Sequence, residues 1–153
     1  MIEIQYNPAL RKNLLNSTLL ERAAHTALKA QAARQDVSLS ILLTDDTQIQ
    51  ELNSEYRGID APTDVLSFEV NERDPETGFL YLGEIIISTP YATRQALKNG
   101  HSLEAETQLL VVHGVLHLLG HDHAEPEEKS RMWDAQAKIL TSLGLSGIKI
   151  QEI

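Results

Sequence analysis

Four of the chain's six histidines lie within one short segment, HGVLHLLGHDH, which runs from His113 to His123. The apolar residues around the first two histidines are typical of a helix, in which residues four apart share one face. His113 and His117 therefore place two imidazoles close together, and both can reach one zinc ion at about 2.0–2.1 Å. The segment predicts a helix that carries a metal-binding face.

A third ligand has to come from beyond the straight part of this helix. At 1.5 Å per residue, His121 would lie about 12 Å further along the helix than His113, too far for two ligands of one ion. Gly120 can take a left-handed conformation, end the helix and turn the chain back toward the ion. Geometry alone leaves both His121 and His123 open as the third ligand.

The type of ligand indicates the kind of chemistry. Three neutral imidazoles and one open coordination position are the pattern of catalytic rather than structural zinc. Zinc can lower the pKa of a bound water from about 15.7 to about 7, so hydrolysis is the natural reaction. The HxxxHxxGxxH spacing also matches the metzincin proteases, in which a Glu after the first His is the general base. Gly114 stands there and argues against peptide hydrolysis; it leaves room for a substrate or packs against a strand.

The remaining pattern predicts an α+β domain, with residues 1–153 forming a single unit. We expect about four strands in a small mixed sheet packed with about five helices, and the metal site on a helix of the C-terminal half and the turn after it. Turn-rich residues between the last two strands favour an antiparallel hairpin. The expected strands are 2–6, 37–44, 65–70 and 79–88. The first expected helix runs from Asn7 and Pro8 to about Arg34, with or without a break. The other expected helices run from Asp45 or Asp46 to Gly58, from Ser88 or Thr89 to Gly100, from Ser102 to Gly120, and from Glu125 to near Gly144.

Composition narrows the setting of this site. The chain has no Cys, which excludes disulfides and thiolate ligands. It has no apolar run near the roughly 20 residues of a membrane span, and its first residues do not resemble a signal peptide. We therefore expect a cytoplasmic location and no membrane partner. The formal net charge of −9, taken alone, counts against nucleic acid as a partner, because phosphate binding usually leaves a basic footprint.

Three segments resemble one known family. HGVLHLLGHDH is similar to the HGxLHLxGYDH signature of the YbeY family of metal-dependent endoribonucleases. YRGIDAPTDVLSF, residues 56–68, resembles that family's YRxxDxPTDVLSF stretch, and LGEIIIS, residues 82–88, resembles its LGDIxIS strand. Two positions depart from the pattern: His121 stands where the family usually has Tyr, and Glu84 where it usually has Asp.

The resemblance implies a single-strand-specific, zinc-dependent endoribonuclease. Such an enzyme would act in ribosomal RNA maturation, at the 3′ end of 16S rRNA, and in ribosome quality control. Its partners would be ribosomal RNA and ribosomal particles or assembly proteins. The resemblance also selects His123 over His121, so that His113, His117 and His123 hold one zinc ion per chain, and it implies a role in activity for Arg57.

Other residues have two interpretations each. Arg57 either offsets the dipole at a helix C-terminus or grips a phosphate through its guanidinium, and the resemblance favours the second. Asp64 and Asp122 either orient a ligand histidine through its second ring nitrogen or close a turn, and the two roles are equally supported. Met132 and Trp133 are more typical of core residues than of a base-stacking platform.

Two other functions share these features. A zinc peptidase or small-molecule hydrolase would have the same metal geometry and would cleave casein but no RNA. A non-enzymatic ribosome-assembly module would use zinc only for stability, so that a folded Arg57→Ala variant would keep its cellular function. No residue is identifiable as the general base.

Overall fold

A four-stranded mixed sheet, in the order β1-β2-β4-β3, lies at the centre of the molecule. The computed structural model describes residues 1–10 and 15–148. β1 (Ile2–Tyr6), β2 (Val37–Thr44) and β4 (Leu80–Ser88) run parallel, whereas β3 (Val65–Arg73) pairs antiparallel with β4. The α+β class, the mixed sheet and the hairpin expected from the sequence are confirmed. β3 is left as an edge strand.

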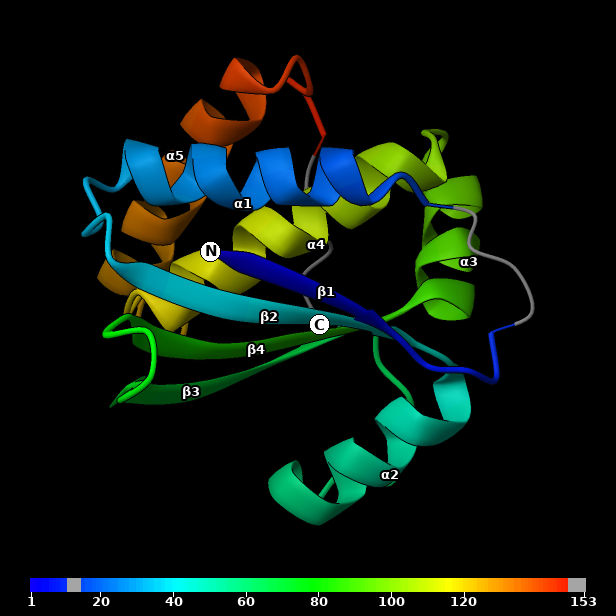
Figure 1. Ribbon diagram of the computed structural model, residues 1–153. Coiled ribbons are helices and arrows are strands. Elements are labelled where there is room, and N and C mark those ends of the chain that lie inside the picture. The colour runs from blue at the N-terminus through cyan, green and yellow to red at the C-terminus, as the bar shows by residue number, and fades with distance from the viewer. Residues whose placement is uncertain (11–14, 149–153) are drawn as a thin grey trace.

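Helices cover both faces of this sheet, but unequally (Figure 1). α1 (Ser17–Ala30), α3 (Thr89–Asn99), α4 (Leu103–Leu118) and α5 (Pro126–Ser142) lie on one face, and α2 (Asp46–Arg57) lies on the other. Within the described residues, no helix has both the length and the apolar character that a membrane span needs.

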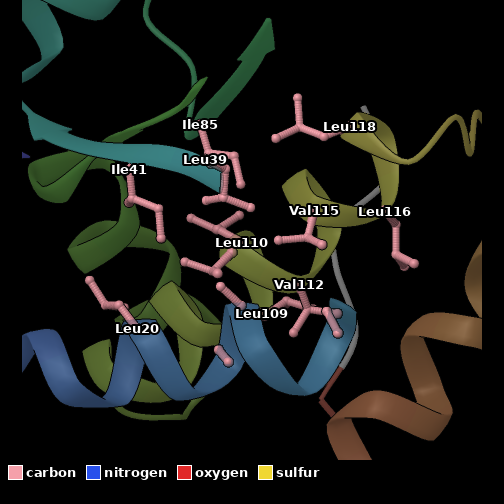
Figure 2. Close-up of a cluster of buried hydrophobic side chains, with 14 of the residues drawn as sticks. Leu20, Leu39, Ile41, Ile85, Leu109, Leu110, Val112, Val115, Leu116 and Leu118 are labelled. Atoms are coloured by element: carbon pink, nitrogen blue, oxygen red, sulfur yellow. The ribbon is translucent and has the colours of Figure 1, made fainter. Parts of the chain in front are cut away.

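α4 is the central helix and is buried on almost every side. It packs against α1, α3 and α5 and against β3 and β4. A helix in that position must be apolar around its whole circumference, which explains the run of leucines and valines that precedes and surrounds the histidines. Figure 2 shows part of this core: Leu39, Ile41 and Ile85 from the sheet, Leu20 from α1, and Leu109, Leu110, Val112 and Val115 from α4.

Short-range capping sets most helix boundaries where the sequence predicts them. The side chain of Asp45 accepts a hydrogen bond from the backbone N–H of Gln48, at 2.9 Å, and so begins α2. Ser88 and Ser102 cap α3 and α4 in the same way. α2 and α3 each end at a glycine in the left-handed conformation, where a β-carbon would be strained.

The predicted bounds of the first helix are wrong at both ends, as far as the structure describes them. Asn7 does not begin a helix: its side chain accepts from the N–H of Ala9, at 2.9 Å, and closes a turn. The expected helical residues 11–14 lie outside the described part of the chain. α1 begins after its cap at Asn16 and ends at Ala30, four residues before Arg34, because Ala32 takes a left-handed φ of 52°. Alanine gives no sequence indication of such a stop.

The hairpin strand β3 is longer than predicted. It continues through Arg73, three residues beyond the expected end, with an irregularity between Glu69 and Glu72 where Asn71 has a φ of 55°. Gly83 lies opposite Glu69 with a φ of 147°, and a β-carbon there would lie 2.0 Å from the carbonyl oxygen of Phe68. Glycine therefore lets the two strands remain paired next to the irregularity.

Candidate metal centre

Three histidine side chains converge at one end of α4. One ring nitrogen from each of His113, His117 and His123 lies within 4.8 Å of the others. The Nε2 atoms of His113 and His117 are 3.1 Å apart. The ring centroid of His123 lies 5.8 Å from that of His113 and 5.2 Å from that of His117. The structure therefore brings together the three histidines that the family resemblance selects.

A glycine turn delivers the third ring. After α4, the N–H of Gly120 donates to the carbonyl of His117 at 3.0 Å, and the N–H of His121 donates to the carbonyl of Leu116 at 2.9 Å. These two bonds form a Schellman motif. The motif requires a left-handed residue just after the last turn of the helix, and Gly120 has that conformation, with a φ of 99°. The chain reverses here, so His123 can face the helix that it has just left.

His121 points elsewhere. Its Nε2 lies 2.7 Å from the Oε1 of Gln31, beyond the end of α1, and this side chain is not part of the converging set. Its contribution to the centre comes from the main chain, because its carbonyl oxygen accepts a hydrogen bond from the Nδ1 of His117 at 3.0 Å.

The hydrogen bonds of the two helical rings fix their protonation. A carbonyl oxygen can only accept, so His117 carries its proton on Nδ1 and presents a lone pair on Nε2. His113 places its Nδ1 3.0 Å from the Oε1 of Gln136, on α5, which gives the same result. Two lone pairs that face each other at 3.1 Å repel unless a cation lies between them. The donor set therefore fits a metal ion.

Burial keeps these rings neutral, which is the form that binds a metal. Desolvation, helped by the neighbouring His117, lowers the pKa of His113 from 6.5 to about 3. Desolvation also lowers the pKa of His117, and the next cause is the proximity of His123. His123 itself is exposed, so the centre opens to solvent on the side of the turn.

Gly114 faces the sheet and not the ion. A β-carbon at this position would lie 2.9–3.0 Å from three side-chain atoms of Ile85 on β4. Of the two interpretations of Gly114, close packing against a strand is therefore the one that the structure supports. The glutamate base of the metzincin motif has no room at this position.

Arg57 lies beside the same centre, although it comes from the opposite face of the sheet. It is the last residue of α2, and its guanidinium donates to the carbonyl of Ser67 on β3 at 2.8 Å. Its Cζ lies 5.5 Å from the ring centroid of Phe68. Arg57 and the three histidines line one cavity of about 740 Å³, whose side wall is the edge strand β3.

The two candidate carboxylates make local contacts. Asp64 is buried and accepts from the N–H of Val65 at 2.8 Å, and Asp122 accepts from the N–H of His123 at 2.7 Å. Within the described residues, neither carboxylate is hydrogen-bonded to a ring of the cluster. Both line the cavity, and desolvation raises the pKa of Asp64.

Sequence reasoning missed Gln136 and did not foresee that Trp133 also lines the cavity. Gln136 is a buried amide on the apolar face of α5, and a buried polar group of this kind needs a partner; that requirement could have identified it. Met132 lies in the core as expected. Trp133 is partly buried and packs against the same core, and it also forms part of the cavity wall.

The fold and the site define an α+β protein with a three-histidine centre suited to a metal ion, set in an open cavity. The family model described as Endoribonuclease YbeY matches residues 5–144. The chain belongs to this family.

Individual relatives agree. The chain is 47% identical over 131 residues to the endoribonuclease YbeY of Pelotomaculum thermopropionicum, an alignment that covers 84% of this chain and 86% of the relative. It is 43% identical over 152 residues to that of Roseiflexus castenholzii, covering 95% and 94%. Among solved structures, it resembles the solution structure of TM1509 from Thermotoga maritima, with a TM-score of 0.60, 27% identity and coverage of 94% and 92%.

Proposed function

We propose that residues 1–153 act as one domain with endoribonuclease activity that depends on one zinc ion per chain. One observation carries the proposal: His113, His117 and His123 present their ring nitrogens to a common point, in a cavity that Arg57 also lines. Neutral imidazoles suit zinc among the divalent ions. The names of the relatives support RNA as the substrate.

The chain's own residues prepare the centre for the ion. The Oε1 of Gln136 and the main-chain carbonyl of His121 hold the two helical rings with their Nε2 atoms facing each other, so that both would be available to the ion. When bound, the ion would supply Lewis-acid activation of the phosphate group and of a water. The exposed side of the centre, at His123, leaves an approach for the substrate.

Arg57 is suited to hold the phosphate that is cleaved. The contacts with Ser67 and Phe68 fix the guanidinium at the cavity wall and leave donors for a phosphate oxygen. A cation held in this way stabilises the negative charge that grows on the phosphate oxygens during cleavage.

The cellular role follows from the family. We propose that the chain acts in the cytoplasm, in ribosomal RNA maturation including the 3′ end of 16S rRNA, and in ribosome quality control, with ribosomal particles or assembly proteins as partners. Single-stranded RNA suits the cavity, because an unpaired strand can bring one phosphate to a recessed centre.

The test is a cleavage assay on matched substrates with zinc-loaded protein. We expect cutting of a single-stranded RNA, little cutting of the same sequence in a duplex and none of casein. Cyclic phosphate ends on the products would indicate attack by the ribose 2′-hydroxyl, and their absence would indicate attack by water. Casein cleavage without RNA cleavage would overturn the proposal in favour of a peptidase.

A further inference from the structure

We propose that the indole of Trp133 is a stacking platform for one unpaired nucleobase, and that Lys129 contacts an adjoining phosphate. This inference rests on the proposed endoribonuclease function and assigns a binding subsite within the same cavity.

The position of Trp133 supports the subsite. Its ring lies 5.9 Å from that of His113 and 5.7 Å from that of His123, in edge-to-face arrangements. It lines the cavity and is only partly buried, whereas the preceding residue, Met132, is completely buried in the core. Met132 therefore belongs wholly to the core, whereas Trp133 packs against the core and also lines the cavity. A base that stacks on this indole would lie next to the metal centre.

Lys129 provides the charge that a nucleotide needs beside its base. It precedes Trp133 by one helical turn, and its Nζ lies 5.6 Å from the indole ring centroid. A second pair of the same kind, Arg57 over Phe68, lies in the same cavity. The described wall of the cavity thus combines two aromatic rings with the lining Arg and Lys, a combination that binds single-stranded nucleic acid through stacking and phosphate contacts.

The other charged side chains of the described cavity wall are acidic, so phosphate binding depends on these two cations. The carboxylates of Asp64, Glu69 and Asp122 also line it, and they repel phosphate. Among the described side chains that line the cavity, Arg57 and Lys129 are therefore the ones that attract the phosphates of a bound strand. Both faces of a base are covered by its neighbours inside a duplex, so stacking on Trp133 favours substrates with an unpaired, displaced base.

Trp133 is the only tryptophan of the chain, so its fluorescence reports directly on stacking. The probe is a single-stranded hexamer of 2′-O-methyl ribonucleotides, checked for integrity after titration into zinc-loaded protein. We expect saturable quenching. Because the Trp133 variants have no tryptophan, the affinity of every protein is compared by the fluorescence anisotropy of an end-labelled hexamer. We expect Trp133→Leu to weaken binding about 10- to 100-fold, in line with the usual effect of losing one base stack, and Trp133→Phe to restore most of it.

Hexamers with a single abasic position separate stacking from a merely structural role. With native protein, the loss of one particular base should weaken binding about as much as Trp133→Leu does. In Trp133→Leu the same abasic hexamer should bind as well as the intact one, because the platform is already missing. The zinc content of each variant is measured on the same samples.

The phosphate contact has its own test in the salt dependence of binding. Lys129→Gln should reduce the slope of log affinity against log salt by about 0.7, the value for one phosphate contact with a single strand. Lys138→Gln, an exposed position on the same helix outside the cavity lining, is the matched control. An unchanged slope in Lys129→Gln would contradict this contact.

The outcomes separate this inference from the function on which it rests. If Trp133→Leu binds the intact hexamer as tightly as native protein does, or if its loss of binding only follows a loss of zinc, the stacking platform is wrong. RNA cleavage by native protein would then still support the endoribonuclease. If native protein neither cleaves RNA nor binds the hexamer, both proposals fail.

Discussion

At the level of single residues, the metal centre depends on groups that would not touch the ion. Gln136 supports the ring of His113 through a contact of 3.0 Å and is itself buried. We predict that Gln136→Ala lowers zinc affinity about 10- to 100-fold, because the ring of His113 loses the acceptor that fixes its orientation. Titration of the metal-stripped protein against a chromophoric chelator measures this. Gln136→Glu keeps an acceptor and should bind zinc more tightly than Gln136→Ala; equal affinity in all three proteins would contradict the role.

Arg57 lends itself to a substitution that keeps its charge. Lysine has no planar fork with which to contact both the Ser67 carbonyl and a phosphate. We predict that Arg57→Lys keeps its zinc but cleaves RNA more slowly, on the order of a hundredfold, the usual effect of removing one donor to a transition state. Single-turnover cleavage and metal content on the same samples check this. Full activity in the variant would show that charge alone is sufficient.

Part of the site was visible at the residue level in the sequence. The spacing of His113 and His117 and the turn at Gly120 predict a helix and a reversal, and the structure has both. Spacing and turn geometry did not decide between His121 and His123, because both follow the glycine; the family resemblance selected His123. The choice depends on where each ring finds a partner, and His121 finds Gln31, ninety residues earlier in the chain.

At the level of elements, the contact between α4 and β4 depends on a residue without a side chain. Alanine at position 114 would improve helix propensity by about 1 kcal/mol but would bring a β-carbon within 3.0 Å of Ile85 in the core. Overpacking usually costs about 1–3 kcal/mol, which exceeds the propensity gain over most of that range, so we predict that Gly114→Ala lowers the free energy of unfolding by up to about 2 kcal/mol. Urea unfolding of the metal-stripped protein measures this.

A double-mutant cycle identifies the cause. In an Ile85→Ala background the crowded side chain is absent, so adding Gly114→Ala should cost much less there than it does in native protein. Equal costs in both backgrounds would place the effect elsewhere than at this contact.

The elements themselves were largely predictable, since capping residues are local signals. Asp45, Ser88 and Ser102 begin helices through hydrogen bonds only a few residues long. The end of α1 was not predictable, because Ala32 takes a left-handed conformation that alanine rarely adopts. Asn is more often left-handed, and Asn71 interrupts β3 without ending it, since pairing with β4 resumes at Glu72.

At the level of the whole molecule, the buried histidines make stability depend on pH. The pKa of His113 is about 3 in the folded metal-free protein and near 6.5 when the chain is unfolded. Below pH 6.5 the unfolded state therefore binds more protons, and stability falls as the pH drops from 6.5 toward 3. One such group contributes a slope of at most about 1.4 kcal/mol per pH unit. We predict that urea unfolding of the metal-stripped protein has a lower midpoint at pH 5.5 than at pH 7.5.

Two buried carboxylates act in the opposite direction. Desolvation raises the pKa of Asp64 and of Glu106, so at acid pH these groups take up protons in the folded state first and favour it. A His113→Gln variant removes the contribution of His113 alone, because it keeps His117 and the carboxylates. Its stability should change less between pH 7.5 and 5.5 than that of native protein, and an equal change would contradict the assignment.

The fold brings together basic residues that the overall composition of the chain does not reveal as a group. A net charge of −9 argues against a nucleic-acid partner, yet the fold brings Arg57, from α2, and Lys129, from α5, to one cavity. These residues are more than seventy positions apart and lie on elements at different faces of the sheet, so no local pattern in the sequence shows that they meet.

The most direct test of the account is the metal content of purified protein, measured by elemental analysis for matched histidine variants. We predict one zinc ion per chain in native protein and in His121→Ala, whose ring points to Gln31, and loss of stoichiometric zinc in His113→Ala and His123→Ala. Native protein without a stoichiometric ion, or zinc that is lost from His121→Ala and kept in His123→Ala, would contradict the three-histidine centre.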